Sequence, residues 1–315
     1  MSLISRREFA ASLASAIGGA AFDSYGTQPG GPRSLSLSQI EIDVGAKTPF
    51  EAIHVSDTHL CLFSPSEAVA MEKGEYVRTR AKGFPDAAAF FAATIAKARE
   101  RNAILLHTGD IIDFISDANL ELVRRHVGEF IFARGNHDYW NPIDPNGKNW
   151  RSDQSRVQAV FGDDLILSSK VVHGVNFVAI DNADGIIYGR TFERLKSEFD
   201  RGLPVVLMMH VPFYTEDLFE FSYFKMGRAK KGSTASLTAV PDEIIDANYP
   251  IGKRERSRAS KTTRETIEFL RSRRELKAIL CGHLHGAFAT RFSGSAMQYV
   301  AGANARGEGY SIRFG

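Results

Sequence analysis

Residues 87–110, AAAFFAATIAKARERNAILLHTGD, contain the pattern that decides the fold, because a predicted helix runs directly into a predicted strand. Apolar residues recur at a helical period over 87–101, whereas the apolar run over 103–110 is typical of a buried strand. That run stops abruptly at Asp110, as a strand does at the carboxyl edge of a sheet. The unit predicts a sheet of parallel strands covered by helices.

The same alternation extends along the chain on both sides of this unit. Further helices are predicted near 118–127, 191–200 and 262–274. Further strands are predicted at 50–57, 129–138, 164–181 with a turn at Gly174, 203–213 and 276–286, and residues 287–315 alternate like an antiparallel set. The segment 214–261 shows no clear period, which is typical of a lid or binding loop, so we expect a lid-like insertion there.

Composition indicates an ordinary globular protein. The chain has 315 residues, 43% hydrophobic and 24% charged, and its formal net charge is +2. This balance provides no global field for nucleic acid or for a membrane surface. The two cysteines, Cys61 and Cys281, are too few for a disulfide framework and are expected to be small buried apolar residues.

The N-terminus differs from the rest of the chain. Arg6 and Arg7 precede an uncharged stretch that extends to Ala21, and a Gly/Pro-rich segment follows up to Pro32. This order resembles a twin-arginine export signal, and the apolar stretch is too short for a transmembrane segment. We therefore expect an export leader and flexible arm over 1–32, a single domain over 33–315, and a periplasmic or secreted protein. The alternative is an amphipathic or disordered arm on a cytoplasmic protein.

Polar residues with metal-binding groups stand where the predicted strands end. They are Asp57 and His59 in SDTH, Asp110 and Asp113 in GDIID, Asn136 and His137 in GNHD, His210 in MMHVP, and His283 and His285 in GHLH. Ligands of open α/β sheets gather at the carboxyl ends of strands, so these segments point to one place. A mixed set of oxygen and nitrogen donors suits Mn, Fe, Co or Zn, and the lack of a thiolate argues against a structural zinc site.

The order DxH, GDxxD, GNHD, H and GHxH resembles the calcineurin-like metallophosphoesterase superfamily, of the bacterial phosphodiesterase or phosphatase type, over about residues 50–286. The resemblance implies a four-layer α/β/β/α sandwich of two mixed sheets, with a dinuclear metal site at the C-terminal ends of the strands. It also implies two divalent or trivalent transition metal ions, drawn from Mn, Fe, Zn and Co.

The resemblance assigns a role to each residue of the set. One ion would be held by Asp57, His59, Asp110 and His285, and the second by Asp110, Asn136, His210 and His283, so that Asp110 bridges the two. His137 would lie beside the ions, where it could hydrogen-bond a phosphate oxygen or protonate the leaving group. Asp113 occupies the position that pairs with His137, and Asp138 is a weaker candidate for that duty.

Histidines outside these motifs are expected to be ordinary strand or surface residues: His54, His107, His126 and His173. His107 lies close enough to Asp110 in the sequence to support the metal ligands.

The implied activity is metal-dependent hydrolysis of a small phosphoester, as a phosphatase or phosphodiesterase, by a hydroxide that bridges the two ions. GDIIDFI and GNHD depart from the GDxVDRG and GNHE of protein serine/threonine phosphatases, and Asp113 replaces the metal-bound Tyr of purple acid phosphatases. The alternatives are a nuclease of the same superfamily, which the near-zero net charge does not favour, and a non-catalytic metal-binding protein, which would not need His137.

Substrate choice is expected to lie in the loops over 60–85, 139–152, 182–190 and 214–261, with no single substrate-binding residue assigned. In the second loop, Tyr139, Trp140 and Trp150 either contact the substrate or anchor the loop on the core.

Overall fold

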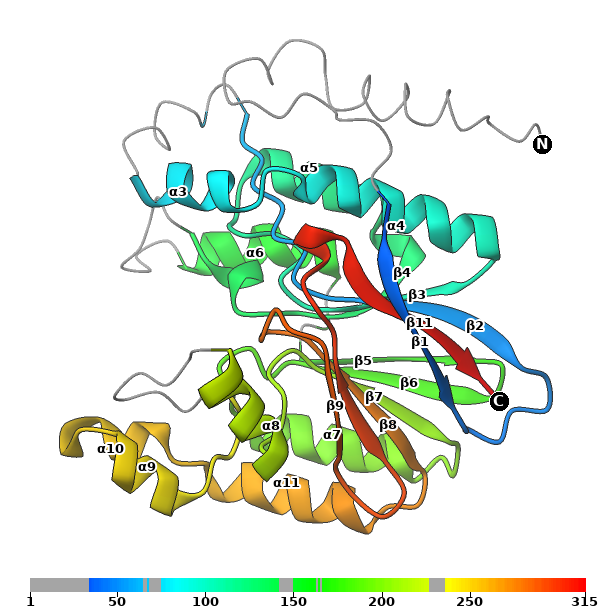
Figure 1. The fold of residues 1–315 in the computed structure, drawn as a ribbon, viewed down its shortest axis with the longest axis vertical. Coiled ribbons are helices and arrows are strands. Elements are labelled where there is room, and N and C mark those ends of the chain that lie inside the picture. Colours follow the sequence, from blue (N-terminus) through cyan, green and yellow to red (C-terminus); the bar gives the residue numbers. More distant parts are fainter. Residues whose placement is uncertain are drawn as a thin grey trace.

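The computed structural model describes residues 34–64, 67, 75–141, 150–162, 164, 166–226 and 236–315. The expected export leader and arm over 1–32 lie outside these residues. The described residues form two mixed sheets that face each other, with helices on the two outer sides (Figure 1).

The first sheet has the strand order β1-β11-β2-β3-β4. Its strands are β1 (Ser36–Ile42), β11 (Glu308–Phe314), β2 (Phe50–Val55), β3 (Ile104–Thr108) and β4 (Phe130–Ala133). Strands β2, β3 and β4 are parallel, so their carboxyl ends share one edge of the sheet. The C-terminal strand β11 runs antiparallel to β2 and parallel to β1.

The second sheet has the order β5-β6-β7-β8-β10-β9. Its strands are β5 (Leu167–Val172), β6 (Val175–Ile180), β7 (Val205–Met208), β8 (Leu276–Cys281), β10 (Met297–Val300) and β9 (Phe288–Arg291). The turn expected at Gly174 joins the antiparallel pair β5 and β6. The expected antiparallel C-terminal set is only partly correct, because β9 pairs antiparallel with β10 while β11 crosses to the first sheet.

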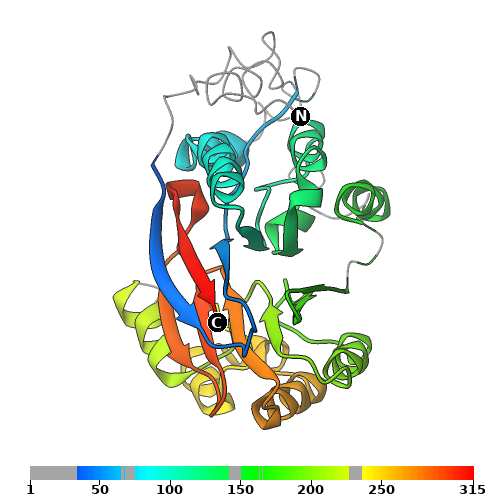
Figure 2. The same cartoon turned by 90° about the vertical axis from the view of Figure 1, so that its right-hand side faces the viewer.

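Apolar side chains fill the three interfaces between the layers. Leu106 and Ile131 of the first sheet pack with Phe177 and Met208 of the second sheet, which forms the central core. The helices α4 (Ala87–Arg101), α5 (Asp117–Arg124) and α6 (Trp150–Phe161) cover the outer side of the first sheet, and α7 (Gly189–Phe199) and α11 (Lys261–Ser272) cover that of the second (Figure 2). The predicted four-layer α/β/β/α sandwich is therefore confirmed.

Helix α4 shows how the sequence pattern produces this packing. Phe91, Ile95 and Ala98 lie on one face and are buried against the first sheet. Full burial of a Phe or Ile side chain contributes about 1.5–3 kcal/mol, so this face fixes the helix on the sheet. Asn102 ends the helix in the left-handed conformation, with φ 50°, and the chain turns directly into β3.

The segment 214–261 contains short helices that the sequence pattern did not predict. They are α8 (Glu216–Glu220), a π-helix over Phe221–Lys225, α9 (Asp242–Asn248) and α10 (Ile251–Ser257), while residues 227–235 are not described. Leu218 and Ile245 of this segment pack with Leu284 and Val300 of the second half of the domain. Its role as a lid stays a prediction.

The remaining helical elements are α3 (Glu75–Gly83) and three short 3-10 helices over Val127–Glu129, His137–Tyr139 and Asn304–Arg306. Within the described parts of the chain, none of the helices combines the length and the apolar character needed to cross a membrane.

Candidate metal centre

The carboxyl ends of strands from both sheets deliver the predicted ligands to one place. Asp57 and His59 follow β2, Asp110 follows β3, His210 follows β7, and His283 and His285 follow β8. Their ligand atoms form three groups, each with all atoms within 4.8 Å of one another: Asp57, His59 and His285; His59, Asp110 and His137; Asp110, His210 and His283. Seven of the nine predicted site residues belong to these groups, and the other two adjoin them.

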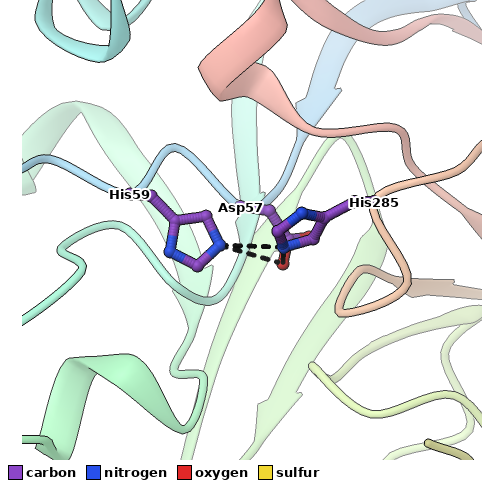
Figure 3. Close-up of side chains that lie close together, drawn as sticks. All are labelled: Asp57, His59 and His285. Atoms are coloured by element: carbon purple, nitrogen blue, oxygen red, sulfur yellow. Dashed lines mark hydrogen bonds and ion pairs between the residues drawn. The ribbon is translucent and has the colours of Figure 1, made fainter. Parts of the chain in front are cut away.

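The first group contains Asp57, His59 and His285 (Figure 3). His285 Nε2 lies 3.2 Å from Asp57 Oδ1, and His59 Nε2 lies 3.7 Å from the same oxygen. The two histidine Nε2 atoms are 2.9 Å apart. Figure 3 shows both rings directed toward the carboxylate from loops on opposite sides of it.

The third group contains Asp110, His210 and His283 and combines residues from both sheets. His210 Nε2 lies 3.3 Å from Asp110 Oδ2, and His283 Nδ1 lies 3.1 Å from His210 Nε2. Asp110 Oδ2 also lies 3.8 Å from His59 Nε2, which belongs to the first group. Asp110 therefore belongs to the third group and also adjoins the first, and the remaining group, His59, Asp110 and His137, connects the two.

Asn136 lies between Gly135 and His137 in the loop that follows β4. The main-chain N–H of His137 donates to Asp110 Oδ1 at 2.8 Å, which holds this loop against the shared carboxylate. The side-chain oxygen of Asn136 is buried and, among the described residues, has no hydrogen-bond partner.

The backbone at most of these residues adopts the left-handed conformation. Asp57, His59, Asp110, His283 and His285 have φ values of 54°, 49°, 54°, 69° and 58°. Each such non-glycine residue costs of order 1–3 kcal/mol and persists only where the surroundings enforce it. The fold therefore holds five of the seven predicted ligands in a strained geometry, which is typical of functional sites.

Glycine precedes three of the site residues because a side chain would collide with the ligands. A Cβ at Gly135 would lie 2.1 Å from Asp110 Oδ1, and one at Gly282 would lie 2.5 Å from Asp57 Oδ2. A Cβ at Gly109 would lie 2.5 Å from His210 Nδ1. The glycines of GD, GN and GH thus allow the loops to pack directly against the carboxylates and the imidazole.

Hydrogen bonds to the far side of two rings fix which nitrogen faces the centre. Asp113 Oδ1 accepts from His59 Nδ1 at 2.7 Å, which leaves His59 Nε2 directed toward Asp57. The main-chain oxygen of Thr108 accepts from His210 Nδ1 at 2.8 Å, which leaves His210 Nε2 directed toward Asp110. Partners of this kind orient histidine ligands and raise their basicity.

His137 and Asp113 contact each other in two ways. His137 Nδ1 donates to the main-chain oxygen of Asp113 at 2.9 Å and lies 3.4 Å from its carboxylate. The shortest carboxylate–imidazole contact of Asp113 is with His59, so this carboxylate serves both rings rather than His137 alone. The carbonyl fixes the proton of neutral His137 on Nδ1, and Nε2 is the nitrogen left for other partners.

Arg80 and Phe84, at the end of α3, cover this side of the centre. Arg80 Nε donates to Asp113 Oδ2 at 3.0 Å, and Arg80 Nη2 donates to the other oxygen. Phe84 stacks on the ring of His59 with 4.6 Å between centroids, and the Arg80 guanidinium lies over Phe84. The sequence pattern did not assign this role to either residue, because Arg80 and Asp113 are 33 positions apart and no local motif links them.

Asp138 has a structural role rather than a catalytic one. Its carboxylate is buried and accepts the main-chain N–H groups of Gly135 at 2.8 Å, Asp110 at 3.0 Å and Ile112 at 3.1 Å. Burial and the nearby Asp110 raise the pKa of Asp138 to about 7. Asp138 thus joins the loops after β3 and β4.

A chain of buried hydrogen bonds holds Thr58, the residue between Asp57 and His59, in place. His107 Nδ1 accepts from the Gly109 N–H, so its Nε2 carries the proton and donates to Thr58 Oγ1 at 2.9 Å. Thr58 donates to Asn304 Oδ1, and Asn304 donates to Thr94 of α4. Burial lowers the pKa of His107 to about 3, which keeps the ring neutral. His107 therefore supports the ligand loop, as its position near Asp110 suggested.

Asn182 was not identified from the sequence, although it positions a ligand. Its side-chain oxygen accepts the main-chain N–H of His210 at 3.0 Å, and its amide donates to Val211 O at 2.7 Å. Asn182 follows β6 at the same edge of the sheet, so its position just after a predicted strand could have identified it from the sequence.

Electrostatics show that the centre is a strongly negative site. Burial lowers the pKa of His59, but the carboxylates of Asp113, Asp57 and Asp110 outweigh burial and raise this pKa to about 10. Asp110 likewise outweighs burial at His210 and raises its pKa to about 9. Burial raises the pKa of Asp57 and Asp110, yet the surrounding histidines hold both below their usual range. Positive charge is therefore strongly favoured here.

The residues fit metal ions on three observations. Asp57 Oδ1 and Asn136 Oδ1 are buried oxygens that lack hydrogen-bond partners within the described residues. Pairs of imidazole nitrogens face each other at 2.9 Å and 3.1 Å, where a shared cation would satisfy both lone pairs. Carboxylate, amide and imidazole donors form the set that Mn, Fe, Co and Zn accept.

Comparison with known proteins places the chain in a family. The model of the calcineurin-like phosphoesterase family matches residues 51–287. That match covers most of the chain, so the protein belongs to this family and is a metal-dependent hydrolase of phosphoesters. A search of curated proteins gave no match.

Solved structures that match the chain include a phosphatase and two 5'-nucleotidases. A dimetal phosphatase from Danio rerio is 12% identical, with a TM-score of 0.43 and coverage of 82% of this chain and 88% of that chain. A 5'-nucleotidase from Candida albicans is 12% identical, with a TM-score of 0.38 and coverage of 87% and 47%. A 5'-nucleotidase precursor from Thermus thermophilus is 14% identical, with a TM-score of 0.34 and coverage of 84% and 54%. The chain thus spans about half of each nucleotidase.

Proposed function

We propose that this enzyme hydrolyses small phosphoesters at a centre of two transition metal ions. Asp57, His59, Asp110 and His285 would hold one ion, and Asp110, Asn136, His210 and His283 the other. The observation that carries the proposal is the position of Asp110, whose carboxylate lies within 3.8 Å of His59 in one donor group and within 3.3 Å of His210 in the other.

The ions would supply Lewis-acid activation of water and neutralise charge on the phosphoryl oxygens. His137 is the protein group suited to proton transfer, because the Asp113 carbonyl holds Nδ1 and leaves Nε2 for the substrate. The Asp113 carboxylate lies 3.4 Å from Nδ1, on the side of the ring away from the nitrogen that would donate a proton to the leaving oxygen.

The burial of the centre supports a small substrate. Asp57, Asp110 and His210 are fully or almost fully buried, whereas the side chains of His137 and His285 are 19% and 25% exposed. A phosphate group would approach past these two histidines. The near-zero net charge gives little support to binding of a nucleic acid polymer.

A metal-dependence assay tests the proposal. Purified protein should cleave p-nitrophenyl phosphate or bis-p-nitrophenyl phosphate, lose activity on prolonged chelation and regain it with Mn, Fe, Co or Zn. The ratio of the two rates separates a monoesterase from a diesterase, and elemental analysis of protein from its own host identifies the ions. Full activity after complete removal of metal would contradict the proposal, as would preferred release of nucleotides from single-stranded DNA.

A further inference from the structure

A cavity of about 450 Å³ opens directly beside the proposed metal centre. Asn136, a proposed ligand, forms part of its wall, and Tyr139, Asp181, Asp184 and Tyr188 also line it. Its volume exceeds what a phosphate group needs and lies in the range of small-molecule sites. The cavity is therefore placed to hold the part of a substrate that is attached to the phosphate.

Several contacts fix the part of the cavity wall that Tyr139 and Asp181 form. The hydroxyl of Tyr139 donates to Asp181 Oδ2 at 2.5 Å, and the guanidinium of Arg134 lies over the Tyr139 ring, 5.0 Å from its centroid. Arg134 is buried and lies 3.8 Å from Asp181 Oδ2. Asp181 Oδ1 accepts the Ala183 N–H at 3.0 Å. Tyr139 is thus fixed in place beside Asn136.

Tyr188 contributes an exposed aromatic ring to the cavity wall. The Tyr188 ring is 56% exposed. Its hydroxyl donates to Asp184 Oδ2 at 2.5 Å, which holds the ring at the cavity. An exposed but tethered tyrosine provides contact area at low entropic cost on binding.

We propose that this cavity binds the alcohol part of the substrate, and that this part is a flat ring carrying amino or hydroxyl groups. The inference rests on the proposed phosphoester hydrolysis at the adjoining centre. Flat rings stack on tyrosine, and the carboxylates of Asp181 and Asp184 accept hydrogen bonds but donate none, so the ring must supply the donors. Arg190 is the one guanidinium among the residues that line the cavity in the described structure, where it accompanies the two carboxylates.

Three esters of primary alcohols test the inference with leaving groups of similar reactivity: ethyl phosphate, benzyl phosphate and 3-aminobenzyl phosphate, or their methyl diesters for a diesterase. The metal-loaded enzyme should prefer benzyl to ethyl phosphate by at least about fivefold in kcat/KM, the usual worth of one stacked ring, through a lower KM. The kcat/KM for 3-aminobenzyl phosphate should exceed that for benzyl phosphate.

Variants assign these preferences to residues. Tyr188→Ala should abolish the preference for benzyl phosphate and leave kcat/KM for ethyl phosphate within about twofold of the wild-type value. Tyr188→Phe keeps the ring and should retain the preference. Asp184→Asn should reduce only the added preference for 3-aminobenzyl phosphate. Equal benzyl-to-ethyl ratios in the wild type and Tyr188→Ala would overturn the inference.

Binding of non-hydrolysable phosphonates separates this inference from the proposed function. If no ester is cleaved, the proposed function fails, yet calorimetry still tests the cavity. Benzylphosphonate should bind the metal-loaded wild type at least about fivefold more tightly than ethylphosphonate does. In Tyr188→Ala, the two phosphonates should bind with equal affinity. Equal binding of both phosphonates to the wild type would refute the assignment of the cavity.

Discussion

At the scale of single residues, the centre depends on close approach between loops as much as on the donor atoms. Gly135 and Gly282 are the positions where the loops after β4 and β8 meet the carboxylates of Asp110 and Asp57. A motif such as GD or GN is thus informative in two ways. The second residue supplies the ligand or its neighbour, and the glycine removes the atom that would displace a carboxylate.

Gly135→Ala should impair the centre, because the new Cβ would lie 2.1 Å from Asp110 Oδ1. Displacement of a reacting group by about 1 Å can cost about 10²-fold in rate, so we expect a loss of that order in kcat/KM together with weaker metal retention. Gly128→Ala is the matched control, because no atom lies within 4 Å of its added Cβ. Equal activity of both variants would show that Gly135 is not needed for the close approach.

His137→Asn should reduce turnover by about 10²-fold to 10⁴-fold, the usual worth of a positioned acid. Metal content should stay unchanged, because His137 is proposed to act on the substrate rather than to hold an ion. The measurement is kcat beside elemental analysis of the same sample. Loss of an ion in this variant would assign His137 to the ligands instead.

At the scale of elements, the strand ends were the most predictable feature of the sequence. An apolar run followed by Asp, Asn or His identified β2, β3, β4, β7 and β8 and the residues that follow them. Contacts between distant segments were not predictable in this way. The ion pair of Arg80 with Asp113 and the pairing of β11 with β1 depend on tertiary packing, which leaves no local pattern. The short helices α8, α9 and α10 were missed because five to seven residues show too little periodicity.

Asp138 is the residue that holds two of these elements together, and its replacement should lower stability. Asp138→Ala leaves three main-chain N–H donors without their acceptor, and each buried donor left unpaired costs about 1–3 kcal/mol. We expect the free energy of unfolding in urea to fall by at least about 2 kcal/mol.

Asp43→Ala is the matched control for this change, because Asp43 is exposed and, among the described residues, its carboxylate accepts only the Gly45 N–H. It should change the free energy of unfolding by less than about 0.5 kcal/mol. Similar losses of unfolding free energy in both variants would contradict the role of Asp138 in joining the two loops.

At the scale of the whole molecule, the centre exists only when the two sheets face each other. Asp57 and Asp110 come from the first sheet, and His210, His283 and His285 come from the second. Residues separated by as many as 228 positions, Asp57 and His285, are thereby brought within 3.2 Å. The sequence order of the motifs identified the family, whereas this distance follows from the packing of the sheets alone.

Export is a separate prediction for the whole chain and concerns residues outside the described structure. If Arg6 and Arg7 form a twin-arginine signal, replacing both with Lys should retain a C-terminally tagged protein in the cytoplasm of a bacterial host with that translocase. Cell fractionation measures the outcome, and the unaltered leader should deliver the protein to the periplasm. A cytoplasmic location for both proteins would favour the alternative of a non-exported arm.

The metal content of Asp110→Asn tests the central claim most directly, because this carboxylate is proposed to hold both ions. Elemental analysis after loading and dialysis should find two ions per wild-type chain and two in the Asp43→Asn control. The account predicts that Asp110→Asn, nearly the same size but without the negative charge, loses metal and activity together. An Asp110→Asn protein that keeps two ions per chain would contradict it.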